Sequence, residues 1–357
     1  MIPVTKPFLP PQGDYAKLIA GIWERNILTN SGPLAKELES KLALHLHLKQ
    51  DHFLFLSNGT IAIQIAIKAL GLTGEIITTP FSYVATTSSV VWEGCTPVFV
   101  DIDEGSLNID PTKIESKITA NTTAILATHV YGNPCNIDAI QTIANKHKLK
   151  VIYDAAHCFG SLYKGKSVYA YGDFSTASFH ATKLFHTVEG GAIYSDDSNL
   201  IQIASKMRNF GHAGPYSFSH LGINGKNSEV HAAMGLVNLR YVDEILAMRK
   251  KLSLYYDQAL AHIDVRKIQL NPDGQFNYSY YPVIFPTESA LLNAMEKLTK
   301  NNILPRRYFY PDLSQLPYVQ STDLPIAKQV SRCVLCLPLY HTLSLSEIDF
   351  IANTLKN

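Results

Sequence analysis

Apolar residues recur along the chain in two alternating patterns. Short apolar runs of strand length, such as HFLFLS (52–57) and TAILATHV (123–130), alternate with segments of helical spacing, such as IAIQIAIKALGL (61–72). This alternation predicts a doubly wound α/β sheet that binds ligands at the carboxyl ends of its strands. The other strands predicted in this half of the chain are EIITTP (75–80), PVFVDID (97–103), KVIYDAA (150–156), FSTASF (174–179) and GGAIYS (190–195).

A long helical stretch from Glu229 to Leu260 is predicted to bridge into a second domain. That domain combines two predicted strands, NYSYYPVIF (277–285) and VLCLPLY (334–340), with two predicted helices, SALLNAMEKLTKNN (289–302) and SEIDFIANTLKN (346–357). We therefore expect three parts: an N-terminal arm with a short helix over 1–33, a large α/β domain over 34–245, and a small C-terminal domain over 246–357.

Composition and charge exclude several classes of protein. The 357 residues are 46% hydrophobic and 17% charged, which is typical of a globular rather than a disordered protein. The net charge of +1 gives no broad basic surface, so we expect no nucleic-acid partner. No run approaches the roughly 20 apolar residues of a membrane span. The proline-rich start, MIPVTKPFLPPQGDY, does not resemble a signal peptide, so we expect a cytoplasmic protein without membrane contact.

The five cysteines do not form a recognisable framework. Their number is odd and they are scattered, which argues against disulfides. Cys333 and Cys336 form a C-x-x-C pair without the second pair or the nearby βαβ start that a zinc or redox site requires. We therefore interpret VLCLPL (334–339) as a buried strand.

Two charged residues stand at predicted strand ends. Asp154 ends the apolar run VIY, where a buried carboxylate is unfavourable unless a cation or strong donors meet it. Lys183 has no charged neighbour close in sequence and precedes a Gly-Gly pair, with Ser178 five residues before it. From the residues alone, Asp154 and Lys183 form either a structural ion pair or part of a site, and Asp154 could also cap the next helix.

The same region contains what a pyridoxal phosphate site requires. Such a site needs a lysine amine that bonds to the cofactor and a carboxylate that keeps the ring nitrogen protonated. It also needs N–H and hydroxyl groups for the phosphate, which a strand, Gly-Thr turn and helix can provide, and a flat side chain over the ring. The candidates for these four roles are Lys183, Asp154, Gly59 and Thr60 with Ser178, and Tyr83.

Several blocks, in order, show that the chain resembles the DegT/DnrJ/EryC1/StrS sugar aminotransferases, which are fold-type I pyridoxal phosphate enzymes. The resemblance extends over nearly the whole chain. It implies a mostly parallel central sheet flanked by helices, with a smaller α/β C-terminal domain. The blocks are TNSGPLAKELE (29–39), LSNGTIAI (56–63), PFSYVATTSSV (80–90), PVFVDID (97–103), ATHVYGNPCNID (127–138), VIYDAAHCFG (151–160), SFHATKLFHTVEGGAI (178–193), GINGKNSEVHAAMGL (222–236) and RRYFYP (306–311).

The resemblance also implies roles for individual residues. Lys183 matches the lysine that bonds to the cofactor and moves protons, and Asp154 matches the acid that holds the pyridine nitrogen. His157 takes the position that contacts the ring hydroxyl, and Tyr83 that of the aromatic stacked on the ring. The phosphate would be bound by Gly59, Thr60 and Ser178, with Asn224 supplied by the partner subunit, so a homodimer with shared active sites is implied.

Two departures from the family pattern lie outside these roles. Where the family often has G-E-G-G, this chain has Val188 followed by Glu189-Gly190-Gly191, and after GIN it has Gly225-Lys226 where an arginine is favoured. Because a subgroup with histidine at the lysine position acts as dehydratases, the presence of Lys183 favours transamination.

The N-terminal sequence is most similar to the branch acting at carbon 4 of dTDP-4-keto-6-deoxyhexoses. The implied reaction moves the amino group of L-glutamate to dTDP-4-keto-6-deoxy-D-glucose. It gives dTDP-4-amino-4,6-dideoxy-D-glucose and 2-oxoglutarate, for O-antigen polysaccharide synthesis. Arg306, Arg307 and Tyr308 are candidates for contacting the sugar nucleotide, although they also fit a solvated basic turn. The alternatives are the 4-amino-galacto epimer, a GDP-perosamine-type product, or a non-catalytic regulator with the same fold.

Overall fold

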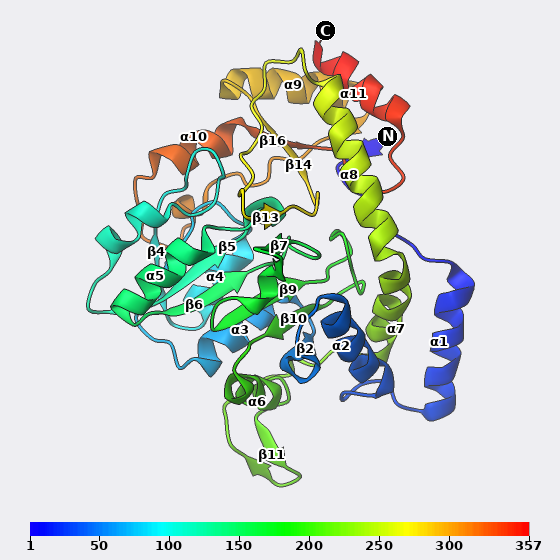
Figure 1. Ribbon diagram of the computed structural model, residues 1–357, viewed down its shortest axis with the longest axis vertical. Helices are drawn as coiled ribbons and strands as arrows, with labels where there is room; N and C mark the ends of the chain where they lie inside the picture. Colours follow the sequence, from blue (N-terminus) through cyan, green and yellow to red (C-terminus); the bar gives the residue numbers. More distant parts are fainter. Residues whose placement is uncertain (357) are drawn as a thin grey trace.

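The computed structural model of the protein describes residues 1–356, so Asn357, the last residue of the predicted small domain, lies outside the described residues. A seven-stranded sheet in the order β2-β10-β9-β6-β5-β3-β4 forms its centre (Figure 1). Within this sheet β10 runs antiparallel to both neighbours, and the other pairings are parallel. The predicted mostly parallel α/β sheet is confirmed. Its strands are β2 (Phe53–Leu56), β3 (Glu75–Thr78), β4 (Thr96–Phe99), β5 (Thr122–Thr128), β6 (Lys150–Asp154), β9 (Phe174–Ser178) and β10 (Gly191–Tyr194).

The sheet is buried on both faces, which explains its nearly continuous apolar strands. In β5, for example, Ile125 and Ala127 pack into one layer, whereas Ala124 and Leu126 pack into the other. The first layer contains α2 (Pro33–His45), α5 (Ile137–His147) and α7 (Glu229–Asn238), with α1 (Gln12–Arg25) packed outside α7. The second contains α3 (Gly59–Ala69), α4 (Val84–Trp92) and α6 (Ser198–Met207).

A separate hydrophobic core lies beyond the sheet, formed by Ile2 and by residues between 252 and 352. Its elements are α8 (Val242–Ala259), β14 (Tyr281–Ile284), α9 (Glu288–Lys300), β15 (Ile303–Leu304), β16 (Val334–Leu337) and α11 (Leu345–Lys356), with α10 (Pro325–Cys333) alongside. The first strand, β1 (Ile2–Pro3), pairs with β15, so the start of the chain lies against its C-terminal part (Figure 1). The exact domain boundaries stay a prediction.

The predicted long helix from Glu229 to Leu260 is wrong in one respect, because it is two helices. A short 3-10 turn over Leu239–Tyr241 separates α7 from α8. Tyr241 has φ −111° and ψ −1°, which departs from helical geometry, and the acidic residues Asp243 and Glu244 then occupy the first turn of α8. The break lets α7 pack on the sheet while α8 continues into the second core (Figure 1).

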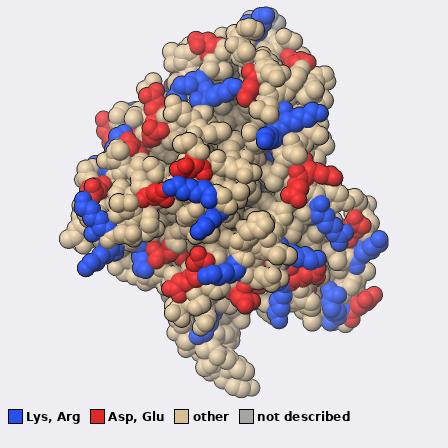
Figure 2. All heavy atoms as spheres, viewed as in Figure 1, with Lys and Arg blue, Asp and Glu red and all other residues tan. Residues whose placement is uncertain are grey.

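The remaining short strands form one two-stranded hairpin and one three-stranded sheet in the order β13-β7-β8. The hairpin of β11 (His212–Gly214) and β12 (Ser217–Phe218) projects from the lower end of the molecule (Figure 1). Figure 2 shows acidic and basic side chains interspersed over one face, whereas this projection carries neither. In residues 1–356 no helix has the length and apolar character to cross a membrane. The other short strands are β7 (Leu162–Tyr163), β8 (Lys166–Ser167) and β13 (Gly274–Gln275).

Candidate active site

A cavity of about 290 Å³ opens at the edge of the sheet where the parallel strands end. Because β10 is antiparallel, it begins at this edge, and the loop between β9 and β10 carries Lys183 into the cavity. Segments from the C-terminal part of the chain close the other side. Of the eleven residues that the sequence singles out, nine line this cavity: Gly59, Thr60, Tyr83, Asp154, His157, Ser178, Lys183, Arg306 and Tyr308.

One end of the cavity is built to accept an anion. Asn58 caps α3 by accepting a hydrogen bond from the Ile61 N–H at 2.8 Å. Within residues 1–356, the N–H groups of Gly59 and Thr60 have no hydrogen-bond acceptor, and both residues line the cavity next to Ser178. Free N–H groups at a helix N-terminus, with a hydroxyl beside them, suit a phosphate.

Two glycines, one at the start of α3 and one at the start of β10, let these elements and β9 lie close together around this anion site. A Cβ on Gly191, at the start of β10, would lie 2.6 Å from the Gly59 nitrogen and overlap the Asn58 carbonyl. A Cβ on Gly59 would lie 3.0 Å from the Ser178 Cβ. The second glycine of the Gly-Gly pair after Lys183 is therefore explained by packing: only a residue without a side chain at position 191 lets β10 pass beside the start of α3.

Asp154 ends β6 and is buried, with 6% of its surface exposed. Its Oδ2 accepts a hydrogen bond from the Thr86 hydroxyl at 2.7 Å, and its Oδ1 accepts one from the Ala156 N–H at 3.1 Å. Burial raises the pKa of this carboxyl, while these two donors and the charge of Lys183 act to lower that pKa. The donors thus support an ionised carboxylate in a buried place.

A chain of buried hydroxyls extends behind that carboxylate. Thr128 donates to Ser82 at 3.1 Å, Ser82 lies 2.8 Å from the Thr86 hydroxyl, and Thr86 donates to Asp154. Because Thr86 uses its proton on Asp154, Ser82 must be the donor to Thr86. All three protons therefore point toward the carboxylate, and they favour its charged form.

Lys183 reaches the cavity from the loop after β9. Burial lowers the pKa of its amine, and the negative charge of Asp154 opposes that shift. No salt bridge joins the amine to any carboxylate in the described part of the chain, so the alternative of a direct Asp154–Lys183 ion pair is not observed. The cavity therefore holds an amine that is easily made neutral, as a nucleophile or base requires.

His157 lies three residues after Asp154 and is also buried. Its Nδ1 accepts a hydrogen bond from the Tyr131 N–H at 3.2 Å. Burial, together with the charge of Lys183, holds the pKa of the imidazole well below its usual value. The ring is therefore neutral, and because Nδ1 is an acceptor the proton lies on Nε2, ready to donate to an oxygen.

The three candidates for the sugar nucleotide differ in their positions. Arg306 and Tyr308 line the cavity, with the Arg306 guanidinium 4.9 Å from the centre of the Tyr308 ring. Arg307 points away: it donates to Glu288 at 2.9 Å and lies over the Tyr310 ring at 3.6 Å. The expectation that both arginines face one ligand therefore does not hold within this chain, because Arg307 lies at a tight turn, where the Tyr308 N–H donates to the Arg306 carbonyl at 3.1 Å, and it is held by Glu288.

Asn224 does not reach the cavity of its own chain. It is exposed and accepts a hydrogen bond from Lys226 at 2.8 Å, in the segment that follows the projecting hairpin.

Residues outside the sequence-based set also line the cavity, and Tyr280 is the most important. Its hydroxyl accepts a hydrogen bond from the Lys183 amine at 3.5 Å. The sequence NYSYYPVIF predicts only a packed strand, and nothing in that sequence marks Tyr280, which lies immediately before β14. Thr86 is also missing from the sequence-based set, although it follows Tyr83 by three residues and so lies on the same face of the helix. His129, in contrast, is fully buried and stacked on Tyr153.

Comparison with known proteins agrees with this geometry. The sequence profile of the DegT/DnrJ/EryC1/StrS aminotransferase family matches residues 12–356. A dTDP-4-amino-4,6-dideoxy-D-glucose transaminase from Shigella dysenteriae is 42% identical over 99% of this chain and 98% of that protein, and one from Escherichia coli is 41% identical over 96% and 95%. A GDP-perosamine synthase from Caulobacter vibrioides is 33% identical over 90% and 89%.

Solved structures show the same fold. DesI, crystallised in the presence of its TDP-sugar product, has a TM-score of 0.94 at 30% identity, covering 99% of this chain and 92% of that one. Helicobacter pylori PseC, an aminotransferase involved in the biosynthesis of pseudoaminic acid, has a TM-score of 0.91 at 25% identity, covering 99% and 98%. With the profile match and the full-length relatives, these likenesses show that the chain belongs to the DegT/DnrJ/EryC1/StrS aminotransferase family of pyridoxal phosphate-dependent enzymes.

Proposed function

We propose that the protein transfers the amino group of L-glutamate to carbon 4 of dTDP-4-keto-6-deoxy-D-glucose. The products are dTDP-4-amino-4,6-dideoxy-D-glucose and 2-oxoglutarate, the former for the synthesis of an O-antigen-type polysaccharide. The observation that carries the proposal is the identity of 42% and 41%, over nearly the full length, to two relatives named for that amino sugar. The intact Lys183 in the cavity supports transamination as the chemistry.

The residues of the cavity fit pyridoxal phosphate. The free N–H groups of Gly59 and Thr60, with Ser178, would hold the phosphate, and the ionised Asp154 would bind the protonated ring nitrogen. His157 would donate from Nε2 to the ring hydroxyl, and Tyr83, at the start of α4, would cover the ring. When bound, the cofactor supplies an electron-withdrawing ring that stabilises the charge left on carbon when a proton is removed.

The chain itself supplies the proton transfers. The Lys183 amine, whose pKa burial lowers, would take the proton from the α-carbon of glutamate. In the second half of the reaction the same amine would deliver a proton to carbon 4 of the sugar. The Thr86 hydroxyl and the Ala156 N–H donate to Asp154, with Ser82 and Thr128 behind Thr86, and these donors favour the carboxylate form against the burial that raises the pKa of Asp154.

At the mouth of the cavity, Arg306 would bind the diphosphate of the sugar nucleotide. Its backbone is fixed by two hydrogen bonds to Cys336 of β16, at 3.1 and 2.9 Å, so the side chain projects from a rigid position. In residues 1–356 no carboxylate forms a salt bridge with it, which leaves the guanidinium available to phosphate oxygens. Tyr308 lies beside it and would contact the sugar.

We also propose a homodimer with shared active sites. Asn224 is exposed and does not line the cavity of its own chain, and the hairpin segment next to it presents large apolar side chains to solvent. These are Tyr216 (98% exposed), Leu221 (76%) and Phe218 (64%). A protruding apolar surface of this kind suits burial against a second copy.

The five cysteines are free and buried, which supports a cytoplasmic, reducing location.

A second candidate substrate is a GDP-linked 4-keto sugar, which is favoured by the 33% identity to a GDP-perosamine synthase. The test is to incubate the purified protein and cofactor with L-glutamate and either nucleotide sugar, and to identify the product by mass spectrometry and NMR. We expect the gluco amino sugar from the dTDP substrate and slow or no turnover of the GDP substrate. Formation of the galacto epimer alone, or preference for the GDP sugar, would reject the proposal. A Lys183→Ala variant is the control for non-enzymatic amination.

A further inference from the structure

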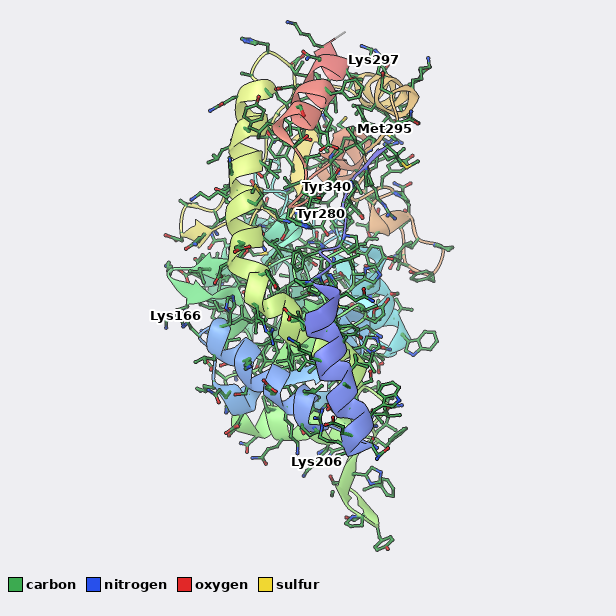
Figure 3. The ribbon with its side chains drawn as sticks, turned by 90° about the vertical axis from the view of Figure 1, so that its right-hand side faces the viewer. Lys166, Lys206, Tyr280, Met295, Lys297 and Tyr340 are labelled. Atoms are coloured by element: carbon green, nitrogen blue, oxygen red, sulfur yellow. The ribbon has the colours of Figure 1, made fainter. Side chains whose placement is uncertain are left out.

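The Lys183 amine has one hydrogen-bond partner in residues 1–356, the hydroxyl of Tyr280 at 3.5 Å. This distance is at the outer limit of a hydrogen bond, so a small movement of the flexible lysine side chain makes or releases the contact. Tyr280 comes from the C-terminal part of the chain, just before β14, and it reaches across to the loop after β9. Figure 3 labels Tyr280 in the middle of the molecule, between its upper and lower parts.

Tyr280 is held in a fixed position by its neighbours. The Ser279 hydroxyl donates to the His157 carbonyl at 2.9 Å, and the buried Arg249 donates to the Ser279 carbonyl at 2.9 Å. The Tyr280 ring packs edge-on against His157, with ring centres 5.1 Å apart, and against Tyr308 at 5.6 Å. A hydroxyl on a rigid ring can therefore define where a mobile amine rests.

Lys183 and Tyr280 both line the main cavity, and both also line a smaller void of about 10 Å³ that reaches Ser279. The amine can therefore lie toward the cavity, where it would meet the cofactor, or withdraw slightly toward the Tyr280 hydroxyl.

We propose that the Tyr280 hydroxyl is the resting position of the Lys183 amine whenever that amine is not bonded to the cofactor. Tyr280 accepts one N–H of the amine and thereby leaves the nitrogen lone pair directed into the main cavity. It is a positioning residue, because it acts through Lys183. The inference rests on pyridoxal phosphate-dependent transamination, but not on which sugar is the substrate.

The electrostatics of the pair support this assignment. Burial raises the pKa of Tyr280, so its hydroxyl stays neutral and adds no charge beside the amine. Burial lowers the pKa of Lys183, so a neutral amine is accessible. A carboxylate in the place of Tyr280 would instead stabilise the ammonium and remove the base.

The test compares two tyrosines that are adjacent in sequence. Tyr280→Phe removes the hydroxyl and keeps the ring. Tyr281→Phe is the matched control, because the Tyr281 hydroxyl donates to Asp257 at 2.7 Å and takes no part in the cavity. Single-turnover rates of both half-reactions are measured, and the pH dependence of Lys183 labelling is followed by mass spectrometry. Labelling uses holoenzyme carrying the amino form of the cofactor, in which Lys183 is free.

We expect Tyr280→Phe to slow both half-reactions by a similar factor, about 2- to 10-fold, with little change in the KM of either substrate. The labelling midpoint of Lys183 should move to lower pH, because the ammonium loses an acceptor. If Tyr280→Phe and Tyr281→Phe behave alike in both measurements, the proposal is wrong. Should Tyr280→Phe fail to fold, substitution of Tyr280 by 3-fluorotyrosine, a weaker acceptor, must shift the midpoint in the same direction. If activity were lost with one nucleotide sugar and kept with another, the result would concern the substrate named in the proposed function and not the role of Tyr280.

Discussion

Removing the Thr86 hydroxyl tests how the enzyme keeps a buried carboxylate charged. Thr86 is fully buried and donates to Asp154 at 2.7 Å. Thr86→Val keeps the shape of the side chain and deletes this donor. A hydrogen bond to a charged group contributes about 1.5–3 kcal/mol. At about 1.4 kcal/mol per unit, its loss should raise the pKa of Asp154 by roughly one to two units.

The expected consequences follow from that shift. A carboxylate with a raised pKa becomes protonated at higher pH, so the acid limb of the pH–rate profile should move to higher pH. Because Asp154 would bind the ring nitrogen less strongly, the dissociation constant of pyridoxal phosphate should rise about tenfold. Cofactor affinity can be measured by equilibrium dialysis, and kcat across a pH series by coupled assay of 2-oxoglutarate.

The neighbouring residue provides the control. Thr87 is equally buried, but its hydroxyl has no hydrogen-bond partner within the described residues. Thr87→Val should therefore leave cofactor affinity and the pH profile unchanged, and it should not reduce stability, because an unpaired buried hydroxyl is removed. If the two variants shift the acid limb and the cofactor affinity equally, the role assigned to the hydroxyl chain is refuted.

Three further predictions concern residues around this centre. Val188→Gly should stabilise the fold by about 0.5–1 kcal/mol in urea unfolding, because Val188 has φ +69°, where a β-branched residue is strained; unchanged or lower stability would contradict this. Burial lowers the pKa of His129 to about 3, whereas in the unfolded chain this pKa is about 6.5. The neutral ring therefore contributes fully to stability above pH 6.5, and this contribution decreases as the pH falls from 6.5 towards 3. Between pH 6.5 and 5 the loss should be about 2 kcal/mol, and His129→Asn should abolish it; an equal slope in both proteins would rule this out. Arg306→Ala should raise the KM for the nucleotide sugar about 10- to 100-fold, whereas Arg307→Ala should leave this KM unchanged, and the opposite pattern would exchange their roles.

Sequence patterns predicted most of the sheet because its strands are short, apolar and buried on both faces. The run KVIYDAA, for instance, corresponds to β6 with Asp154 as its last residue. The same patterns predicted helix boundaries less well where the backbone angles of one residue interrupt a helix. The stretch after Glu229 keeps helical spacing throughout, yet Tyr241 leaves helical geometry, and periodicity does not report a single φ angle.

For the candidate site, residues at strand ends were predictable because parallel strands bring their carboxyl ends to one edge. Asp154, Ser178 and Gly59 meet there for that reason. Tyr280 was not predictable, since its place depends on how the C-terminal part of the chain folds back over the sheet. Nor could the sequence RRYFYP distinguish the orientation of Arg306 from that of Arg307, because the ion pair with Glu288 that draws Arg307 away is a tertiary contact.

The pairing of β1 with β15 has a consequence for how the chain is completed. Ile2 and Pro3 can find their partners only after Ile303 and Leu304 have been synthesised. Phe8, a few residues later, accepts a hydrogen bond from His186, which is three positions after Lys183. The segment from Ile2 to Phe8 therefore ties the second core to the loop that carries Lys183, and the β1–β15 end of this tie can form only after some three hundred residues have been synthesised.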